Sequence, residues 1–181
     1  MTPGQRKVVL TAHVVSSVGW LGAVAAFLAL AIAGLTSANA QTVRAAYVSM
    51  ELMGWLVIVP ASIASLLTGL VHSLGGAWGL FRHYWILFKL LIAILATAVL
   101  FLHMQPIEDV AAIAALRSLS PGELRAVRIQ LVADAVAAIV VLLIATVLSV
   151  YKPRGLTPYG WRKQLESQAA AVKTEGVAAT R

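Results

Sequence analysis

Residues 84–103, YWILFKLLIAILATAVLFLH, form an apolar run that is interrupted by one lysine and ends on a histidine. Twenty residues of α-helix are about 30 Å long, which is the thickness of the hydrocarbon core of a bilayer. His83 precedes the run, so one histidine stands at each end. This stretch therefore predicts a membrane-spanning helix with an imidazole near each surface.

The composition of the whole chain agrees with a membrane protein. Of its 181 residues, 60% are hydrophobic and 12% are charged, whereas soluble domains average about 45–50% apolar residues. The net charge of +7 comes without a basic stripe that contains interleaved aromatic residues, so we expect no nucleic acid partner. The chain has no cysteine, which excludes disulfides, thiolate metal sites and iron–sulfur clusters.

Four apolar segments reach the length of about 20 residues that a spanning helix needs. They cover residues 8–35, 52–75, 84–103 and 131–150. The first resembles a secretory signal, but its 28 apolar residues far exceed the roughly 7–15 of a cleavable core, so we expect a retained helix. The predicted fold is an all-α, integral membrane four-helix bundle.

Lysine and arginine are unevenly divided between the two sides of these segments. Nine lie on the side that carries both termini and four on the other side, with Lys89 just inside a span. Because cytoplasmic loops are enriched in these residues, both termini are expected in the cytoplasm. We therefore expect a multi-pass protein of the bacterial cytoplasmic (inner) membrane, with the lipid bilayer as a partner. Residues 1–163 would form the membrane domain and residues 164–181 a loose cytoplasmic tail.

The connection between the third and fourth segments is the longest. Apolar residues between Ile107 and Leu119 recur at roughly helical spacing, which predicts a short amphipathic helix on the outer surface between helices 3 and 4. Ser120, Pro121 and Glu123 form a capping-box pattern. The fourth helix is therefore expected to start near Pro121.

Two histidines stand near the inner ends of the first two segments. His13 and His72 have similar depths on antiparallel neighbours, and Ser65, Thr68 and Gly69 share the helix face of His72. A groove of small residues with an imidazole on each wall suits haem, whose iron takes axial imidazoles. The alternative is ordinary packing of small residues, with histidines that hydrogen-bond across helices.

Three further residues are candidates for holding haem in this inner layer. Lys89, five residues into the third segment, and Arg82, just before that segment, are cations suited to the propionates. Trp20 follows His13 at i+7 and would form a wall of the cofactor site. The alternatives are that Lys89 snorkels to the membrane surface and that Trp20 only packs.

Glu51, His103 and Asp134 form an outer layer near the outer ends of the second, third and fourth segments. Two carboxylates and an imidazole at one depth suit a divalent metal such as copper or zinc, or a proton-handling site. His103 could instead ligate an outer haem, with Met50 or Met53 as the sixth ligand. Solvation at the membrane surface is the alternative for the two carboxylates.

Helix geometry separates the histidines that flank the opening stretch. At 100° per residue, the twenty residues from His83 to His103 turn the side-chain direction by about 200° beyond whole turns, so the two point to opposite sides. His83, beside Tyr84 and Trp85 in an aromatic belt, is expected to be a surface anchor. His103 shares a face with Lys89 and is expected to point inward.

Short motifs carry a resemblance to known membrane proteins. Residues 13–22, HVVSSVGWLG, resemble the opening of small bacterial proteins related to the copper-resistance D family. Residues 79–89, GLFRHYWILFK, and residues 150–160, VYKPRGLTPYG, look like parts of an actinobacterial set of four-helix membrane proteins. The resemblance covers residues 8–160 and matches only His13 to a motif position. The methionine-rich and multi-histidine stretches of the copper-resistance proteins are missing from the sequence.

The layout is also similar to that of b-type membrane cytochromes, which hold bis-histidine haems near each surface of a four-helix bundle. That similarity implies one or two haem b groups. Those proteins usually place two histidines about half a span apart on one helix, and this chain does not.

Three functions remain open. The first is a b-type cytochrome-like electron carrier that binds haem through His13 and His72, with a redox protein or a quinone as partner. The second is translocation of copper, zinc or protons through Glu51, His103 and Asp134, with the two inner histidines as further metal ligands. The third is a structural assembly subunit, which could be a homo-oligomer. An enzyme with its own substrate is least supported, because the sequence shows no nucleophile–base pair, phosphate loop or metalloprotease spacing.

Overall fold

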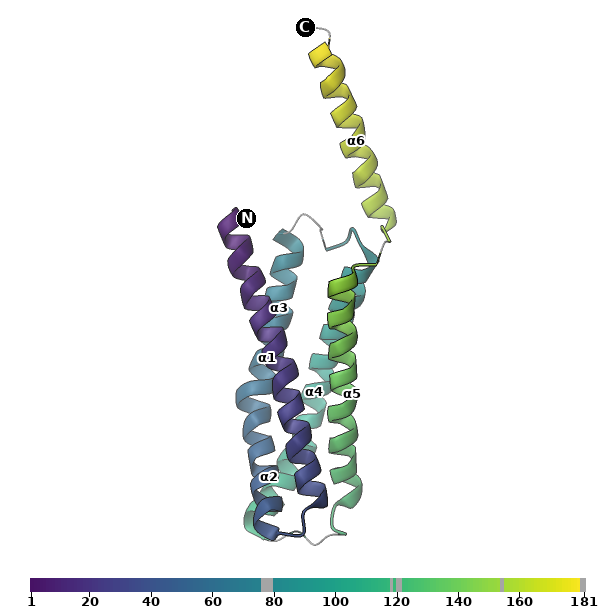
Figure 1. The fold of residues 1–181 in the computed structure, drawn as a ribbon. Helices are drawn as coiled ribbons and strands as arrows, with labels where there is room; N and C mark the ends of the chain where they lie inside the picture. The colour runs from purple at the N-terminus through teal and green to yellow at the C-terminus, as the bar shows by residue number, and fades with distance from the viewer. Residues whose placement is uncertain (76–79, 118, 120–121, 154, 180–181) are drawn as a thin grey trace.

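The computed structural model describes residues 1–75, 80–117, 119, 122–153 and 155–179, with side chains as far as residue 171. Its elements are α1 (Pro3–Thr36), α2 (Ala40–Met53), η1 (Gly54–Ile58), α3 (Val59–Gly75), α4 (Tyr84–Leu116), α5 (Arg125–Tyr151) and α6 (Pro158–Ala179). All of these elements are helical, and the described part of the chain contains no β-strand (Figure 1). The predicted all-α class is confirmed.

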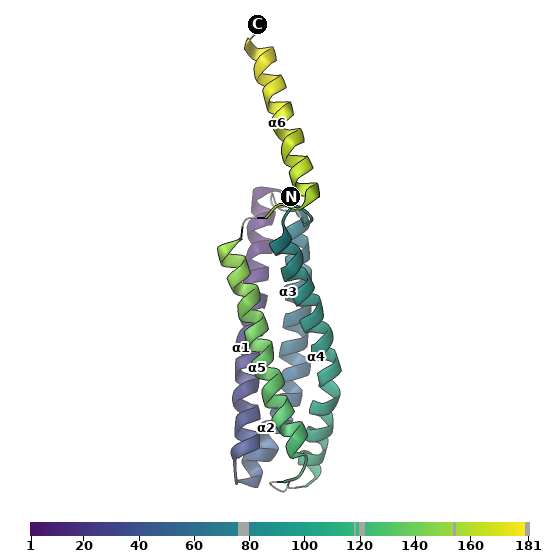
Figure 2. The same cartoon turned by 90° about the vertical axis from the view of Figure 1, so that its right-hand side faces the viewer.

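Four long helices lie side by side and antiparallel (Figures 1 and 2). The second of them is continuous through α2, η1 and α3, and each of the four is long and apolar enough to cross a membrane. Both α1 and α4 pack against α5 and against the continuous second helix, so the four form a bundle. We call the end with the start of α1 and the end of α5 the terminal end, and the opposite end the far end.

Side-chain caps explain where the first two helices begin. Thr2 and Gln5 form a reciprocal capping box at the start of α1. Before α2, Oδ1 of Asn39 accepts hydrogen bonds from the backbone N–H of Gln41, at 2.8 Å, and of Thr42, at 3.2 Å. An N-cap of this kind satisfies otherwise unpaired N–H groups. The second helix therefore begins well before residue 52, where the apolar run starts.

One π-turn, η1, interrupts the continuous second helix. Pro60 follows it closely and has no N–H to donate to the carbonyl four residues earlier, a defect that a π-bulge can absorb. At the start of η1, a Cβ on Gly54 would come within 2.8 Å of Cε of Met104. The missing side chain thus lets the second helix and α4 approach each other closely.

The third long helix differs from the sequence prediction beyond residue 103. α4 runs through Pro106 to Leu116 without a break, so the segment expected to be a separate surface helix forms its last turns. The apolar residues of that segment face the bundle, where Val110 and Ala114 are each 1% exposed. α5 begins at Arg125. The cap predicted at Ser120 and Pro121 lies outside the described residues.

The buried core occupies the far half of the bundle. Its members come from every long helix: Trp20, Ala23, Val24, Phe27, Ala31, Val43, Tyr47, Met50, Ile58, Val59, Met104, Ile107, Val110, Ala114, Leu131 and Ala135. In the terminal half, α1 has no buried residue before Trp20, and α5 has none after Ala135. An open, mostly apolar hollow of about 440 Å³ lies there against the first turns of α1. The two halves of the bundle are therefore packed very differently.

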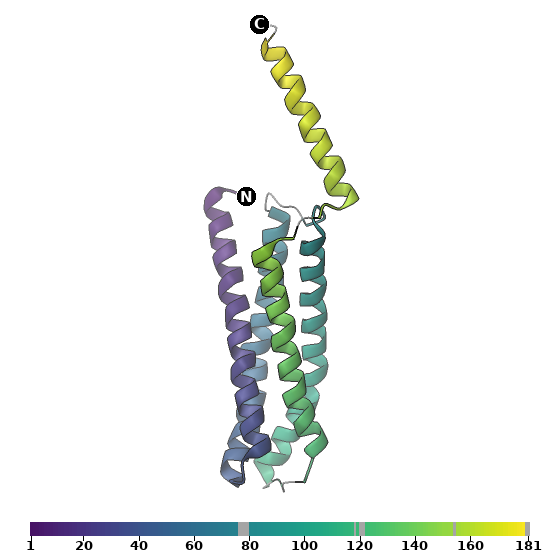
Figure 3. The same cartoon turned by 45° about the vertical axis from the view of Figure 1, so that its right-hand side comes forward.

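Helix α6 leaves the bundle at the terminal end (Figures 1 and 3). Its start is fixed to the connection before α4, because the N–H of Thr157 donates to the carbonyl of Arg82 at 3.0 Å. Oγ1 of Thr157 in turn accepts the N–H of Gly160 at 3.1 Å. Residues 164–179, expected to be a loose tail, are helical in the structure. The side of the membrane on which they lie stays a prediction.

Candidate functional site

His13 lies at the contact between α1 and α3 in the terminal half. Its Nδ1 is 3.1 Å from the carbonyl oxygen of Ser65 and 3.3 Å from Oγ1 of Thr68. A carbonyl oxygen can only accept, so Nδ1 carries the proton. The Thr68 hydroxyl donates to the carbonyl of Ala64, which leaves its oxygen able to accept from His13. With Nδ1 engaged as donor, Nε2 of neutral His13 holds a lone pair.

Gly69 makes room for this imidazole. A Cβ on Gly69 would come 2.9 Å from Cε1 of His13 and 3.3 Å from its Nδ1. One turn closer to the far end, Oγ of Ser17 and Oγ of Ser65 are 2.8 Å apart. The face of α1 that carries His13 and Ser17 therefore meets the face of α3 that carries Ser65 and Gly69, as their helical spacing predicted.

His72 and Lys89 lie in the same part of the bundle as His13. His72 follows Gly69 by three residues on α3, so it shares that face one turn closer to the terminal end. Lys89 lies on α4, which packs against α3. The three groups that the sequence places in an inner layer therefore occupy the same half of the bundle.

The other inner candidates lie farther from His13. Trp20 is 5% exposed and belongs to the packed core, two turns closer to the far end. Arg82 and His83 lie in the connection before α4, where the backbone of His83 pairs with the segment that leads into α6. The His83 ring is 6.4 Å from the Trp85 ring. His83 is therefore a residue of the terminal surface, where the anchor was expected.

His103 on α4 and Asp134 on α5 meet in the far half. Nε2 of His103 is 3.1 Å from Oδ2 of Asp134, and its Nδ1 is 2.8 Å from the carbonyl oxygen of Val99. Oδ2 is shielded from solvent and accepts no hydrogen bond from the described residues. Among those residues, the polar group near it is Nε2 of His103.

The two contacts of His103 orient its ring. Nδ1 donates to the Val99 carbonyl, which can only accept. Nε2 then lies 3.1 Å from Oδ2 of Asp134, a separation at which protonated His103 would form an ion pair with the carboxylate. Ionisable residues inside a membrane span commonly pair with one another in this way.

Glu51 does not join this pair in a metal site. Among the described residues, no three His, Asp or Glu side chains are grouped so that they could hold a metal ion. Met50, considered as a haem ligand beside His103, is 0% exposed and packs in the core. The three-residue outer site expected from the sequence is therefore reduced to His103 and Asp134.

Arg128 is an important residue whose burial was not predicted from the sequence. It is 2% exposed, and its Nε donates to the Tyr47 hydroxyl at 2.9 Å. Its Nη2 donates to the carbonyl of Gly34, so one side chain of α5 ties together α1 and α2. Arg128 lies on the same face of α5 as the buried residues Leu131 and Ala135. That spacing of three and four residues is the feature of the sequence from which its burial could have been predicted.

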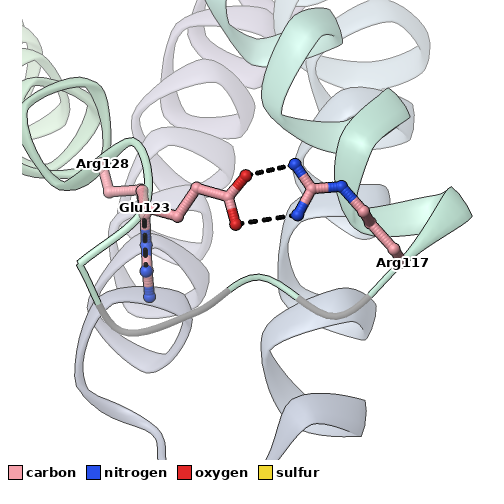
Figure 4. Close-up of polar contacts among 3 residues, drawn as sticks. All are labelled: Arg117, Glu123 and Arg128. Carbon is pink, nitrogen blue, oxygen red and sulfur yellow. Dashed lines mark hydrogen bonds and ion pairs between the residues drawn. The ribbon is translucent and has the colours of Figure 1, made fainter.

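The same arginine reaches the connection between α4 and α5. Its Nη1 lies 3.5 Å from the carbonyl oxygen of Glu123. The Glu123 carboxylate meets both terminal nitrogens of Arg117 in a bidentate ion pair (Figure 4). Arg128, Glu123 and Arg117 therefore close the far end of the bundle. That closure is a structural role, distinct from the histidine site at the terminal end.

Comparison of the chain with protein-family models, with curated proteins and with solved structures finds no match.

Proposed function

We propose that the chain binds haem b at the terminal end through His13 and His72 and carries electrons as a b-type cytochrome-like membrane protein. One observation carries this proposal. The N–H of Nδ1 of His13 is engaged by the Ser65 carbonyl, so Nε2 presents a lone pair, with a second imidazole one turn beyond Gly69 on the facing helix. Haem iron takes two axial imidazoles in just such cytochromes.

The hydrogen bonding of His13 supports haem as the bound group. Ligating histidines commonly donate their other ring N–H to a carbonyl, as His13 does. The terminal half has no buried residue on α1 before Trp20, so this part of α1 is less tightly packed than the core. The contact between Ser17 and Ser65 closes α1 against α3, which confines the group to the terminal side of that contact.

Each residue then has a definite task. His13 and His72 would hold the iron, and Thr68 would keep the His13 ring in one tautomer. Lys89 and Arg82 would attract the propionates. Bound haem supplies a one-electron redox centre. A redox protein or a quinone would be the partner that exchanges electrons with it.

Titration of the haem-free, detergent-purified chain with haem tests the proposal. We expect one haem per chain, with the low-spin absorption spectrum of two axial imidazoles. Thr68→Val, which removes a hydrogen-bond acceptor from Nδ1, is expected to weaken binding by about tenfold, since loss of such an outer partner costs about 10–100-fold. Thr146→Val is the control, because this threonine lies on α5 and bonds only within its own helix. Folded protein whose addition leaves the haem spectrum unchanged would refute the proposal.

The pair formed by His103 and Asp134 favours proton handling as a second candidate function. Protein reconstituted into liposomes is expected to pass protons under a pH gradient. In Asp134→Asn the flux should fall to that of empty liposomes, because the amide cannot share the proton of His103. Glu51→Gln should leave the flux unchanged, since Glu51 is not grouped with the pair. Equal flux in the wild type and Asp134→Asn would eliminate this function.

A further inference from the structure

The terminal half of the bundle carries cations but no carboxylate. The seven acidic residues lie toward the far end or in α6: Glu51, Glu108, Asp109, Glu123, Asp134, Glu166 and Glu175. Residues 1–50, 52–107 and 135–165 contain no aspartate or glutamate at all. Lys89 therefore has no acidic side chain of this half of the bundle to pair with.

Lys89 is the half-buried lysine of a helix in this half, whereas Lys7 on α1 is exposed. Gly54 on the second long helix lies against Met104 on α4. The two helices are antiparallel, so counting fifteen residues toward the terminal end leads from Gly54 to Gly69 and from Met104 to Lys89. At an equal rise per residue these two are level with each other, and Gly69 contacts His13. The Lys89 side chain is half-buried. It is therefore held at the depth of the histidine site.

Lys89 has no acidic counter-charge in the part of the chain that the structure describes. It takes part in none of the three salt bridges found there. A cation at bilayer depth is costly to hold. A bound anion would offset that cost.

The aromatic neighbour of Lys89 suits the head of an amphiphile. Nζ of Lys89 lies 5.9 Å from the centroid of the Trp85 ring, one turn closer to the terminal end. Tryptophan gathers at the depth of lipid head groups, because it has an apolar body and a polar edge. The ammonium is thus directed toward the level at which acidic head groups lie.

We propose that Lys89, with Trp85 beside it, forms a binding site for the anionic head of an amphiphile. The shared chemistry is an anionic oxygen, which either the phosphate of an anionic phospholipid or a haem propionate supplies. A flexible ammonium binds either group as a point charge. The phospholipid source needs no haem, whereas the propionate source rests on the proposed function.

The first experiment measures lipid binding to the haem-free full-length protein by native mass spectrometry. The wild type is expected to retain phosphatidylglycerol in preference to phosphatidylcholine. Lys89→Gln should lower the affinity for phosphatidylglycerol by about fivefold, the usual effect of one basic residue at an anionic surface, and Lys89→Arg should preserve it. Lys7→Gln is the matched control, because it removes an exposed cation from the same end of the bundle.

The second experiment compares haem with its dimethyl ester, in which both propionates are neutral. Tighter binding of haem by the wild type, with that preference lost in Lys89→Gln, assigns the site to a propionate. If Lys89→Gln loses affinity for phosphatidylglycerol but the wild type does not prefer haem to its ester, the site is assigned to a lipid phosphate. The proposal is overturned if the wild type binds phosphatidylglycerol no better than phosphatidylcholine and haem no better than its dimethyl ester. It is also overturned if Lys7→Gln loses as much affinity for phosphatidylglycerol as Lys89→Gln does. If neither haem nor its ester binds, the haem site fails alone and the lipid measurement decides.

Discussion

A His13→Ala variant is expected to lose its haem while the four-helix bundle stays folded. The substitution removes Nε2, the lone pair proposed for the iron, together with the imidazole that lies against Gly69. Loss of an outer partner of a metal ligand already lowers affinity by about 10–100-fold, so loss of the ligand itself should exceed that range. The measurement is haem absorbance per chain after purification from haem-replete cells.

Two further variants separate loss of a ligand from loss of structure. His83→Ala should keep full absorbance, because that ring lies near Trp85 at the terminal surface and outside the proposed site. His13→Gly should regain haem when free imidazole is added, since imidazole can enter the space that the side chain leaves. Wild-type absorbance in His13→Ala would show that His13 is not a ligand.

The largest loss of stability is expected from Arg128→Ala. The variant leaves the Tyr47 hydroxyl and the Gly34 carbonyl, both in a closely packed region, without the charged donor that now satisfies them. Hydrogen bonds to charged groups contribute about 1.5–3 kcal/mol each, so we expect the loss of both to cost roughly 3–6 kcal/mol. The free energy of unfolding is measured by titration with sodium dodecyl sulfate, followed by circular dichroism.

Arg125→Ala is the matched control for this loss. Arg125 stands one turn earlier on α5 but is exposed, and exposed charges contribute little to stability. Tyr47→Phe should fall between the two, because it removes the hydroxyl and leaves the contact with Gly34 intact. If Arg128→Ala is as stable as Arg125→Ala, Arg128 does not lock the far end.

The sequence predicted the four long helices but misplaced some of their ends. Apolar length alone indicates how much helix a bilayer could cover, whereas the start of α2 depends on the polar cap at Asn39. The end of α4 depends on packing, since the apolar spacing around Val110 serves the bundle core and does not mark a separate surface helix. Neither cause is contained in a count of apolar residues.

For the site, residue spacing along one helix predicted which side chains share a face, but it could not predict how neighbouring helices are rotated about their axes. The faces of His13 and Ser65 were predicted from periodicity, and they meet. Depth alone placed Glu51 with His103 and Asp134, but only the last two face each other. Depth fixes a position along a helix and leaves its direction around the axis undetermined.

Oxidised and reduced absorption spectra of the full-length protein, purified from haem-replete cells, test most directly the claim that His13 and His72 hold haem. The account predicts a red protein with about one haem per chain. It predicts a Soret band that shifts on reduction and the sharp visible bands of low-spin iron with two axial imidazoles. A folded but colourless protein would contradict the account.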